Sequence, residues 1–179
     1  MEEYVYIIDV IPYSNKYKEQ PYGIAIGEKF FTLLEITFKK DIMLPNIGDK
    51  IYVGKNMEKR TVIDKIKGKI TYDHLTTAAK DNIKNVLKKL IIENEQRFVD
   101  FINNSAALSV RIHPLSLLPG IGKKTLEMIL TEKEKERFKS FEDIKKRVDV
   151  WQDPVESIAL RIIEELEGKH KQKFFVLQK

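Results

Sequence analysis

The chain has 179 residues, a net charge of +5 and no cysteine. Without cysteine it has no disulfide framework, no thiol nucleophile and no cysteine-based zinc or iron–sulfur site. The start, Met1-Glu2-Glu3-Tyr4, does not resemble a signal sequence, and no apolar run is long enough to span a membrane. We therefore expect a cytoplasmic protein that does not contact membranes. Its mildly basic charge is compatible with nucleic-acid binding.

The first part of the chain has the composition of short β-strands separated by polar turns. The predicted strands are residues 4–10, 23–27, 30–38, 51–54, 61–66 and 69–72, and the last two form a hairpin that turns at Lys67-Gly68. So many short strands in so few residues favour a small barrel, which leaves no exposed sheet edge. We expect an OB-like β-barrel over residues 1–74.

The loop over residues 12–22 mixes aromatic and basic side chains. Its members of these two kinds are Tyr13, Lys16, Tyr17, Lys18 and Tyr22. Such a mixture suits the stacking of unpaired nucleobases. An ordinary exposed loop, with its tyrosines packed on the rim of the barrel, explains the composition equally well.

Residues 75–104 change to helical periodicity, with apolar residues recurring every three or four positions. Glu93-Asn94-Glu95 predicts a break between two helices, and Asn103-Asn104-Ser105 predicts the end of the second. We interpret this segment as a helical connector and assign it no chemistry.

The stretch 117–125 carries the clearest functional signal. Pro114 predicts a first short helix over residues 115–118, and a second helix follows to about Leu130. Between them, Gly120 and Gly122 allow the chain to reverse tightly and to approach a ligand closely. The turn feeds a helix N-terminus, where unpaired N–H groups and the helix dipole favour an anion such as a nucleic-acid phosphate.

Other residues of the stretch support this interpretation. Ile121 is expected to anchor the turn between the two helices, and Lys123 and Lys124 to add positive charge beside the phosphate. A β-carbon at Gly122 is expected to obstruct the ligand and to strain the turn. This pattern is the signature of a helix-hairpin-helix motif; a tight helix connection without a ligand is the alternative.

The remaining chain predicts two more helices. Ser140 and Asp143 predict a capping box for a helix through Val148. Asp153, with Pro154 and Glu156, caps another helix, which ends at Gly168. The hairpin between these helices, residues 149–153, has no glycine and carries two aspartates, so we expect it to be structural. Residues 105–179 then form a doubled helix-hairpin-helix domain.

The order of these parts resembles an uncharacterised archaeal family, the domain of unknown function 655. The matching residues are Arg111, His113, Leu115, Leu117 and the run 118–124, with a second match over residues 94–103. The resemblance covers nearly the whole chain. It implies an RNA- or DNA-binding protein with an OB-like front end and a helix-hairpin-helix back end, in a family without an established activity.

We therefore expect an α+β protein, a small OB-like barrel followed by an all-α helix-hairpin-helix domain, that binds nucleic-acid backbone phosphates. One hairpin contacts the backbone without reading bases, so binding is expected to be independent of sequence. RNA is favoured over DNA because OB-like barrels often bind RNA. The expected binding residues are Arg111, His113, Gly120, Ile121, Gly122, Lys123, Lys124 and Thr125. His113 is also a good helix N-cap before Pro114.

Two other functions remain open. In a DNA repair glycosylase or lyase Lys124 would be the catalytic lysine, but the expected acidic partner is missing, since Phe141-Glu142-Asp143 is typical of a helix start. In a protein-interaction adaptor the hairpin would only pack. No cofactor is expected. The three histidines, His74, His113 and His170, lack the spacing of a metal site. Catalytic activity is not expected.

Overall fold

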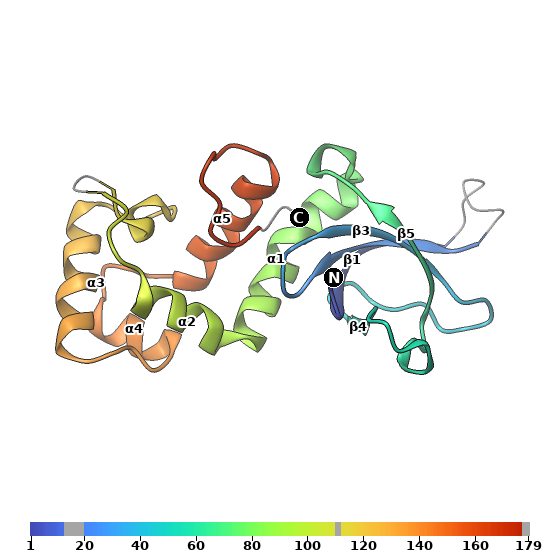
Figure 1. Cartoon of the computed structure of the whole chain (residues 1–179), viewed down its shortest axis with the longest axis horizontal. Helices are drawn as coiled ribbons and strands as arrows, with labels where there is room; N and C mark the ends of the chain where they lie inside the picture. Colours follow the sequence, from blue (N-terminus) through green and yellow to red (C-terminus); the bar gives the residue numbers. More distant parts are fainter. Residues whose placement is uncertain (13–19, 110–111, 177–179) are drawn as a thin grey trace. The chain divides into compact units, whose positions relative to one another are not determined.

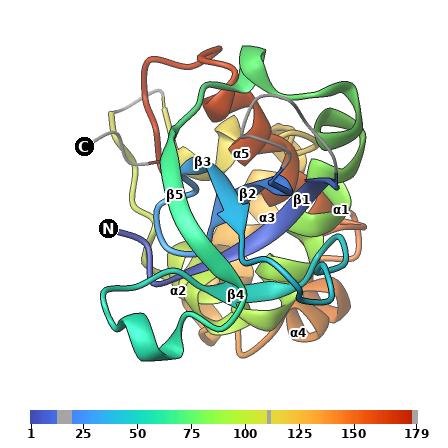
Figure 2. The same ribbon diagram turned by 90° about the vertical axis from the view of Figure 1, so that its right-hand side faces the viewer.

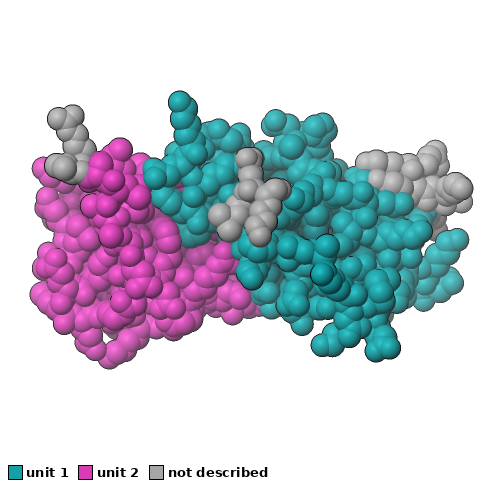
Figure 3. Space-filling model, viewed as in Figure 1, with its two compact units in different colours: residues 1–87, 164–179 teal, residues 88–163 magenta. Residues whose placement is uncertain are grey.

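The computed structural model describes residues 1–12, 20–109 and 112–176. These residues belong to two compact units, residues 1–87 with 164–179 (unit 1) and residues 88–163 (unit 2), shown in different colours in Figure 3. Helices α1 (Thr77–Glu93) and α5 (Pro154–Leu166) contribute residues to both units. The three-part division at residues 74 and 104 stays a prediction.

In the described part of unit 1, five strands form one antiparallel sheet (Figure 1). They are β1 (Tyr4–Ile11), β2 (Tyr22–Gly27), β3 (Leu33–Phe38), β4 (Lys50–Tyr52) and β5 (Ile63–Lys69). Their order, β4-β1-β2-β3-β5, places β4 and β5 at the two edges. The sheet curls into a half-barrel (Figure 2). The expectation of an α+β protein with a β-rich front part is confirmed.

The predicted hairpin at Lys67-Gly68 is wrong. β5 runs unbroken through both residues, and Gly68 pairs with Glu35 of β3. A Lys-Gly pair between two apolar runs resembles a turn locally, but pairing with β3 keeps the strand extended. Tertiary pairing of this kind commonly overrides a local turn signal.

Strands β1, β2 and β3 are buried on both faces along most of their length, whereas β5 keeps the usual alternation of an antiparallel sheet. All six residues of β3 are buried. The cluster inside the curl consists of Val5, Ile7, Ala25, Leu34, Ile36, Phe38, Ile51, Val53 and Ile63. The sheet therefore has a hydrophobic core of its own inside the curl.

A β-bulge in β1 joins the sheet to the start of α1. The register with β2 shifts between Ile7 and Asp9, so Ile8 stands outside the ladder. The side-chain amide of Asn82 donates to the Ile8 carbonyl at 3.1 Å, and the Thr76 hydroxyl donates to the Asp9 carboxylate. Thr76 also accepts the N–H of Ala79 and so caps α1.

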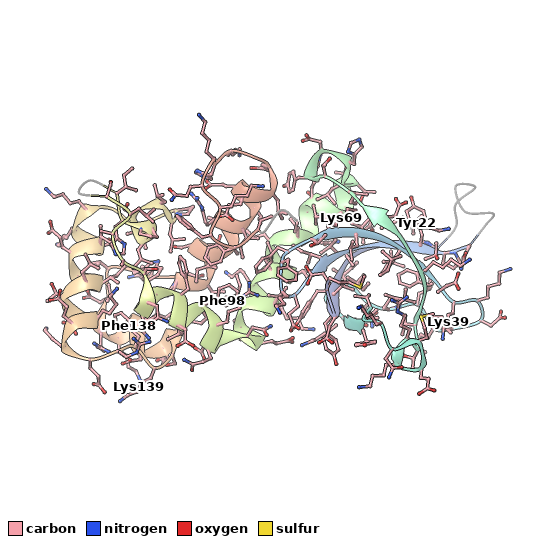
Figure 4. All side chains as sticks on the ribbon, in the orientation of Figure 1. Tyr22, Lys39, Lys69, Phe98, Phe138 and Lys139 are labelled. Atoms are coloured by element: carbon pink, nitrogen blue, oxygen red, sulfur yellow. The ribbon has the colours of Figure 1, made fainter. Side chains whose placement is uncertain are left out.

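Unit 2 contains the end of α1, then α2 (Glu95–Asn104), η4 (Pro114–Leu117), α3 (Lys123–Lys135), α4 (Phe141–Arg147) and most of α5. The predicted break at Asn94 is confirmed, because Asn94 separates α1 from α2. Phe98 of α2 and Phe138, which follows α3, are both buried in this unit (Figure 4). Asn103 fixes the loop after α3, since its side chain donates to the Phe138 carbonyl at 2.8 Å and accepts the Phe138 N–H at 2.9 Å.

The predicted caps of the last two helices are confirmed. Ser140 Oγ accepts the N–H of Asp143 at 3.1 Å and caps α4, and Asp153 Oδ1 accepts the N–H of Glu156 at 2.9 Å and caps α5. Trp151, in the connection between these helices, is buried and donates its Nε1–H to Ser157 Oγ at 2.9 Å. The connection is therefore part of the core of unit 2.

In unit 1, a buried carboxylate holds the last described residues. Glu165 is fully buried, and its two oxygens accept the N–H groups of Phe174, Phe175 and Val176 at 2.9–3.0 Å. Phe175 and Val176 are buried as well. Hydrogen bonds to a carboxylate in a dry site are about twice as strong as neutral ones, so this contact fixes the segment.

We therefore expect Glu165→Gln to lower the free energy of unfolding by about 2–4 kcal/mol, because an amide leaves part of these buried donors unsatisfied. Urea denaturation measures the change. The control is Glu167→Gln, which removes a surface ion pair with Lys169 (2.6 Å) and is expected to cost less than about 1 kcal/mol. Similar losses in the two variants would contradict the anchoring role of Glu165.

Candidate nucleic-acid interface

The glycine turn, defined here as residues 118–122, joins η4 to α3. The N–H of Ile121 donates to the Leu118 carbonyl at 3.2 Å, with Pro119 and Gly120 at the two central positions. Gly120 has φ +85°, in the left-handed region that the third position of a type II turn requires. Leu118 and Ile121 are buried, so the ends of the turn are anchored in unit 2.

The turn leads directly into an exposed helix N-terminus. Gly122 is the N-cap residue of α3, and the first intrahelical bond runs from the N–H of Leu126 to the Gly122 carbonyl at 2.9 Å. Among the described residues no side chain caps this helix. The N–H groups of the first turn therefore point out of the helix end, where the dipole attracts anions.

Gly122 is exposed, and the structure gives no internal reason for a glycine there. Its φ of −86° suits any residue, and a β-carbon would meet no atom within 4 Å. The expectation that a β-carbon at Gly122 strains the turn is therefore wrong: Gly120 carries the conformational requirement. What Gly122 provides is open space beside the N–H groups of α3.

Helix α5 supports the turn from inside unit 2. Arg161 is fully buried, and its guanidinium donates to the carbonyl of Leu117 at 3.2 Å, at the end of η4. Ser157 Oγ, which accepts the Trp151 N–H, lies 3.6 Å from the position that a β-carbon on Gly120 would take. Sequence reasoning missed both residues. The only sequence signal for a buried, functional side chain was Arg161 itself, which lies three residues after Ile158 on an otherwise apolar helix face.

The expected site residues differ in what they present to solvent. Lys123, Lys124 and the two glycines are exposed, whereas the side chains of Ile121 and Thr125 are buried. Thr125 can therefore contribute its backbone but not its hydroxyl. Arg111 lies outside the described residues. So do four residues of the aromatic and basic loop, Tyr13, Lys16, Tyr17 and Lys18.

His113 is the N-cap of η4. Its Nδ1 accepts the N–H of Leu115 at 3.1 Å, which requires that nitrogen to be unprotonated. Partial burial lowers the pKa of His113, and the Lys133 ammonium lowers it further. Lys133, on α3, donates to the Ser105 carbonyl at 2.8 Å. His113 thus has a local structural function, independent of any ligand.

Within residues 1–12, 20–109 and 112–176, no group of three acidic, histidine or cysteine side chains is placed to hold a metal ion. No helix in the same ranges is both long and apolar enough to cross a bilayer.

Comparisons with known proteins establish the family. A family model described as "Protein of unknown function (DUF655)" matches residues 1–177. The chain belongs to this family. The uncharacterised protein MJ0038 of Methanocaldococcus jannaschii is 35% identical over 179 residues, 99% of this chain and 80% of that protein. The crystal structure of Af1531 from Archaeoglobus fulgidus, also of DUF655, has a TM-score of 0.90 and 38% identity, and the match covers 98% of this chain and 100% of that one.

The glycine turn of this DUF655 protein gives a first prediction for the site. Gly120→Ser is expected to lower the free energy of unfolding by about 1–2 kcal/mol, because a side chain resists a positive φ. Gly122→Ser is expected to leave stability unchanged or to raise it by a few tenths of a kcal/mol, since serine is a slightly better N-cap than glycine. Thermal and urea denaturation of the two variants decide this. Equal destabilisation would show that the two glycines are not distinguished as the backbone geometry indicates.

The His113 cap predicts a pH dependence. The pKa of His113 is lower in the folded protein than its ordinary value of 6.5, so the unfolded chain binds the proton more readily. The contribution of neutral His113 to the free energy of unfolding is therefore complete above pH 6.5. It is lost as the pH falls toward the pKa of His113 in the folded protein. Asparagine also caps helices and does not titrate. Relative to wild type, His113→Asn is thus expected to gain stability as the pH is lowered from about 7 to about 5. Parallel pH profiles in urea denaturation would contradict this.

Proposed function

We propose that this protein binds nucleic acid, RNA in preference to DNA, through backbone phosphates at Pro119 to Lys124, the turn of a helix-hairpin-helix motif. The observation that carries the proposal is the uncapped, exposed N-terminus of α3, with open space at Gly122 and two exposed lysines in its first turn. A phosphate oxygen at this position accepts the N–H groups that no side chain of the described residues takes. The same phosphate interacts with the positive end of the helix dipole.

The supporting structure favours a preformed site. The type II turn, the buried Ile121 and the bond from Arg161 to Leu117 hold the loop in one conformation, so little ordering is needed on binding. Backbone N–H groups and lysine ammonium groups recognise phosphate and carry no base information. Binding is therefore sequence-independent.

The proposal extends to the front part of the chain. We interpret the curled sheet as an OB-like module and residues 105–179 as the helix-hairpin-helix domain with a structural second hairpin. Modules of the OB type bind oligonucleotides, which is the reason for placing RNA first. Lys124 is exposed on α3, and no observation of the described residues favours a catalytic function for it.

The first test of the proposal removes the positive charge at the glycine turn. Lys123→Ala/Lys124→Ala is expected to weaken binding to all duplex sequences alike and to lower the slope of log affinity against log salt by about one to two units. The matched control is Lys145→Ala/Lys146→Ala on α4, which removes two exposed lysines outside the turn. Titration of both variants at several salt concentrations measures the slopes. Equal effects would show that diffuse charge binds the nucleic acid.

Gly122→Ser tests the same site without changing its charge. The introduced hydroxyl is placed to accept the N–H of Lys124 or Thr125, the donors proposed for the phosphate. Affinity for nucleic acid should therefore fall although stability does not. If wild-type protein binds neither RNA nor DNA, the turn is a packing element and the adaptor hypothesis replaces this proposal.

A further inference from the structure

A second surface, on unit 1, has the chemistry of a single-strand site. Three hollows of about 640, 210 and 510 Å³ share their walls: Met1 and Glu2 line the first and second, and Phe30 and Lys69 line the second and third. We treat these neighbouring hollows together as one surface region, which we call the β5 groove. All of its lining residues belong to unit 1.

Aromatic and basic side chains both line the β5 groove. Its half-buried aromatic residues are Tyr4, Tyr52, Phe30 and Tyr72, and its lysines are Lys29, Lys55, Lys69 and Lys173. Lys69, on β5, is labelled in Figure 4. Proteins that bind single strands combine aromatic platforms for the bases with a positive track for the backbone.

Basic side chains outnumber acidic ones in the lining of the β5 groove. Glu28 forms an ion pair with Lys50 at 2.5 Å, and the Lys50 ammonium also lies 4.8 Å from the centre of the Tyr4 ring. Glu2 is buried and accepts backbone N–H groups. Four lysines and three carboxylates, Glu2, Glu3 and Glu28, line the groove, so its side chains carry a small net positive charge.

The Glu2 carboxylate fixes the loop that carries Phe30. It accepts the N–H groups of Lys29 (2.9 Å), Phe30 (3.0 Å) and Thr32 (3.2 Å), and Gly27 leaves room for it, because a β-carbon there would lie 2.1 Å from the carboxylate. Phe31, in the same loop, has φ 55°, which costs energy for an aromatic residue. The loop is thus held in a strained conformation that presents Phe30, with the Lys29 ammonium 5.3 Å from its ring centre.

The middle hollow is small and apolar. Phe30, Leu34, Val53 and Ile66 line it, and its volume of about 210 Å³ is below the roughly 300–1,000 Å³ of pockets for complete small-molecule ligands. Part of its wall is the bare backbone of Gly68. Glycine weakens a strand and often marks the close approach of a ligand. The hollow therefore suits one flat group, such as a nucleobase.

We propose that the β5 groove binds single-stranded nucleic acid, with one unpaired base in the hollow at Gly68, stacked on Phe30, and with Lys29 and Lys69 at the adjacent phosphates. Paired bases cannot enter the hollow, so duplexes are excluded from it. The inference rests on the proposed function only in taking nucleic acid as the ligand. It adds a second site and a preference for unpaired strands.

Phe30→Ala tests the hollow. Phe30 lines the hollow and is half-buried, so the substitution removes the proposed stacking platform, and thermal unfolding checks that the fold is kept. Affinity for a labelled oligouridine is expected to fall about 5- to 100-fold, the loss of one stacked base, with duplex RNA binding unchanged. Fluorescence anisotropy measures both ligands. Wild-type affinity of Phe30→Ala for oligouridine would overturn the proposal.

Lys29→Ala/Lys69→Ala provides a second arm that leaves the core intact. It is expected to lower the salt slope for oligouridine by about 1.4, at roughly 0.7 per single-strand phosphate. The control is Lys65→Ala/Lys67→Ala, which removes two exposed lysines of β5 that do not line the groove. Equal slopes in the two variants would overturn the assignment of the lysines.

The two proposals can fail separately. If Lys123→Ala/Lys124→Ala weakens duplex binding while the groove variants bind oligouridine as wild type does, only the groove is rejected. If the groove variants lose affinity for oligouridine while the glycine-turn variants keep wild-type affinity for nucleic acid, only the glycine-turn site is rejected. If the wild-type protein binds no nucleic acid, both proposals are rejected.

Discussion

The irregular segments of this protein depend on buried polar side chains that satisfy their backbone groups. Glu2 accepts N–H groups of the loop after β2, and Glu165 those of the last described residues. Asn103 holds both backbone groups of Phe138, and Arg161 holds the carbonyl of Leu117. An unpaired backbone group in the interior costs as much as a lost hydrogen bond, so each of these side chains fixes one conformation of its segment.

Both proposed sites lie on segments fixed in this way. The glycine turn follows the carbonyl that Arg161 holds, and Phe30 belongs to the loop that Glu2 holds. A preformed loop loses little conformational entropy when a ligand binds, so weak individual contacts to phosphates or bases can contribute more of their free energy to affinity. At the glycine turn, Gly122 also leaves open space at the helix end beside the fixed segment.

The two surfaces differ in the chemistry that they offer. The N-terminus of α3 presents N–H groups and two lysines, which suit the phosphates of any strand. The β5 groove adds aromatic rings and an apolar hollow, which only an unpaired base can use. A protein with both proposed sites would favour RNA that combines paired and unpaired segments, and this agrees with the proposed preference for RNA over DNA.

The sequence by itself determined the features that depend on neighbouring residues. The strand-rich front part, the break at Asn94, the caps at His113, Ser140 and Asp153 and the family could all be predicted, because turns, caps and helical periodicity involve residues within about four positions of each other. The position of the glycine turn before an open helix end followed from the same local rules.

Only the tertiary structure decided which distant groups meet. Lys67-Gly68 resembles a turn in the sequence, but pairing with β3 makes it part of a strand. The sequence also suggested that Gly122 is the conformationally constrained glycine, whereas the backbone angles assign that constraint to Gly120. The buried Glu2, Arg161 and Glu165 looked like surface charges in the sequence, where charged residues usually face water. The backbone partners of Glu2 and Arg161 lie between 27 and 44 residues away along the chain, and no local pattern encodes such a distance.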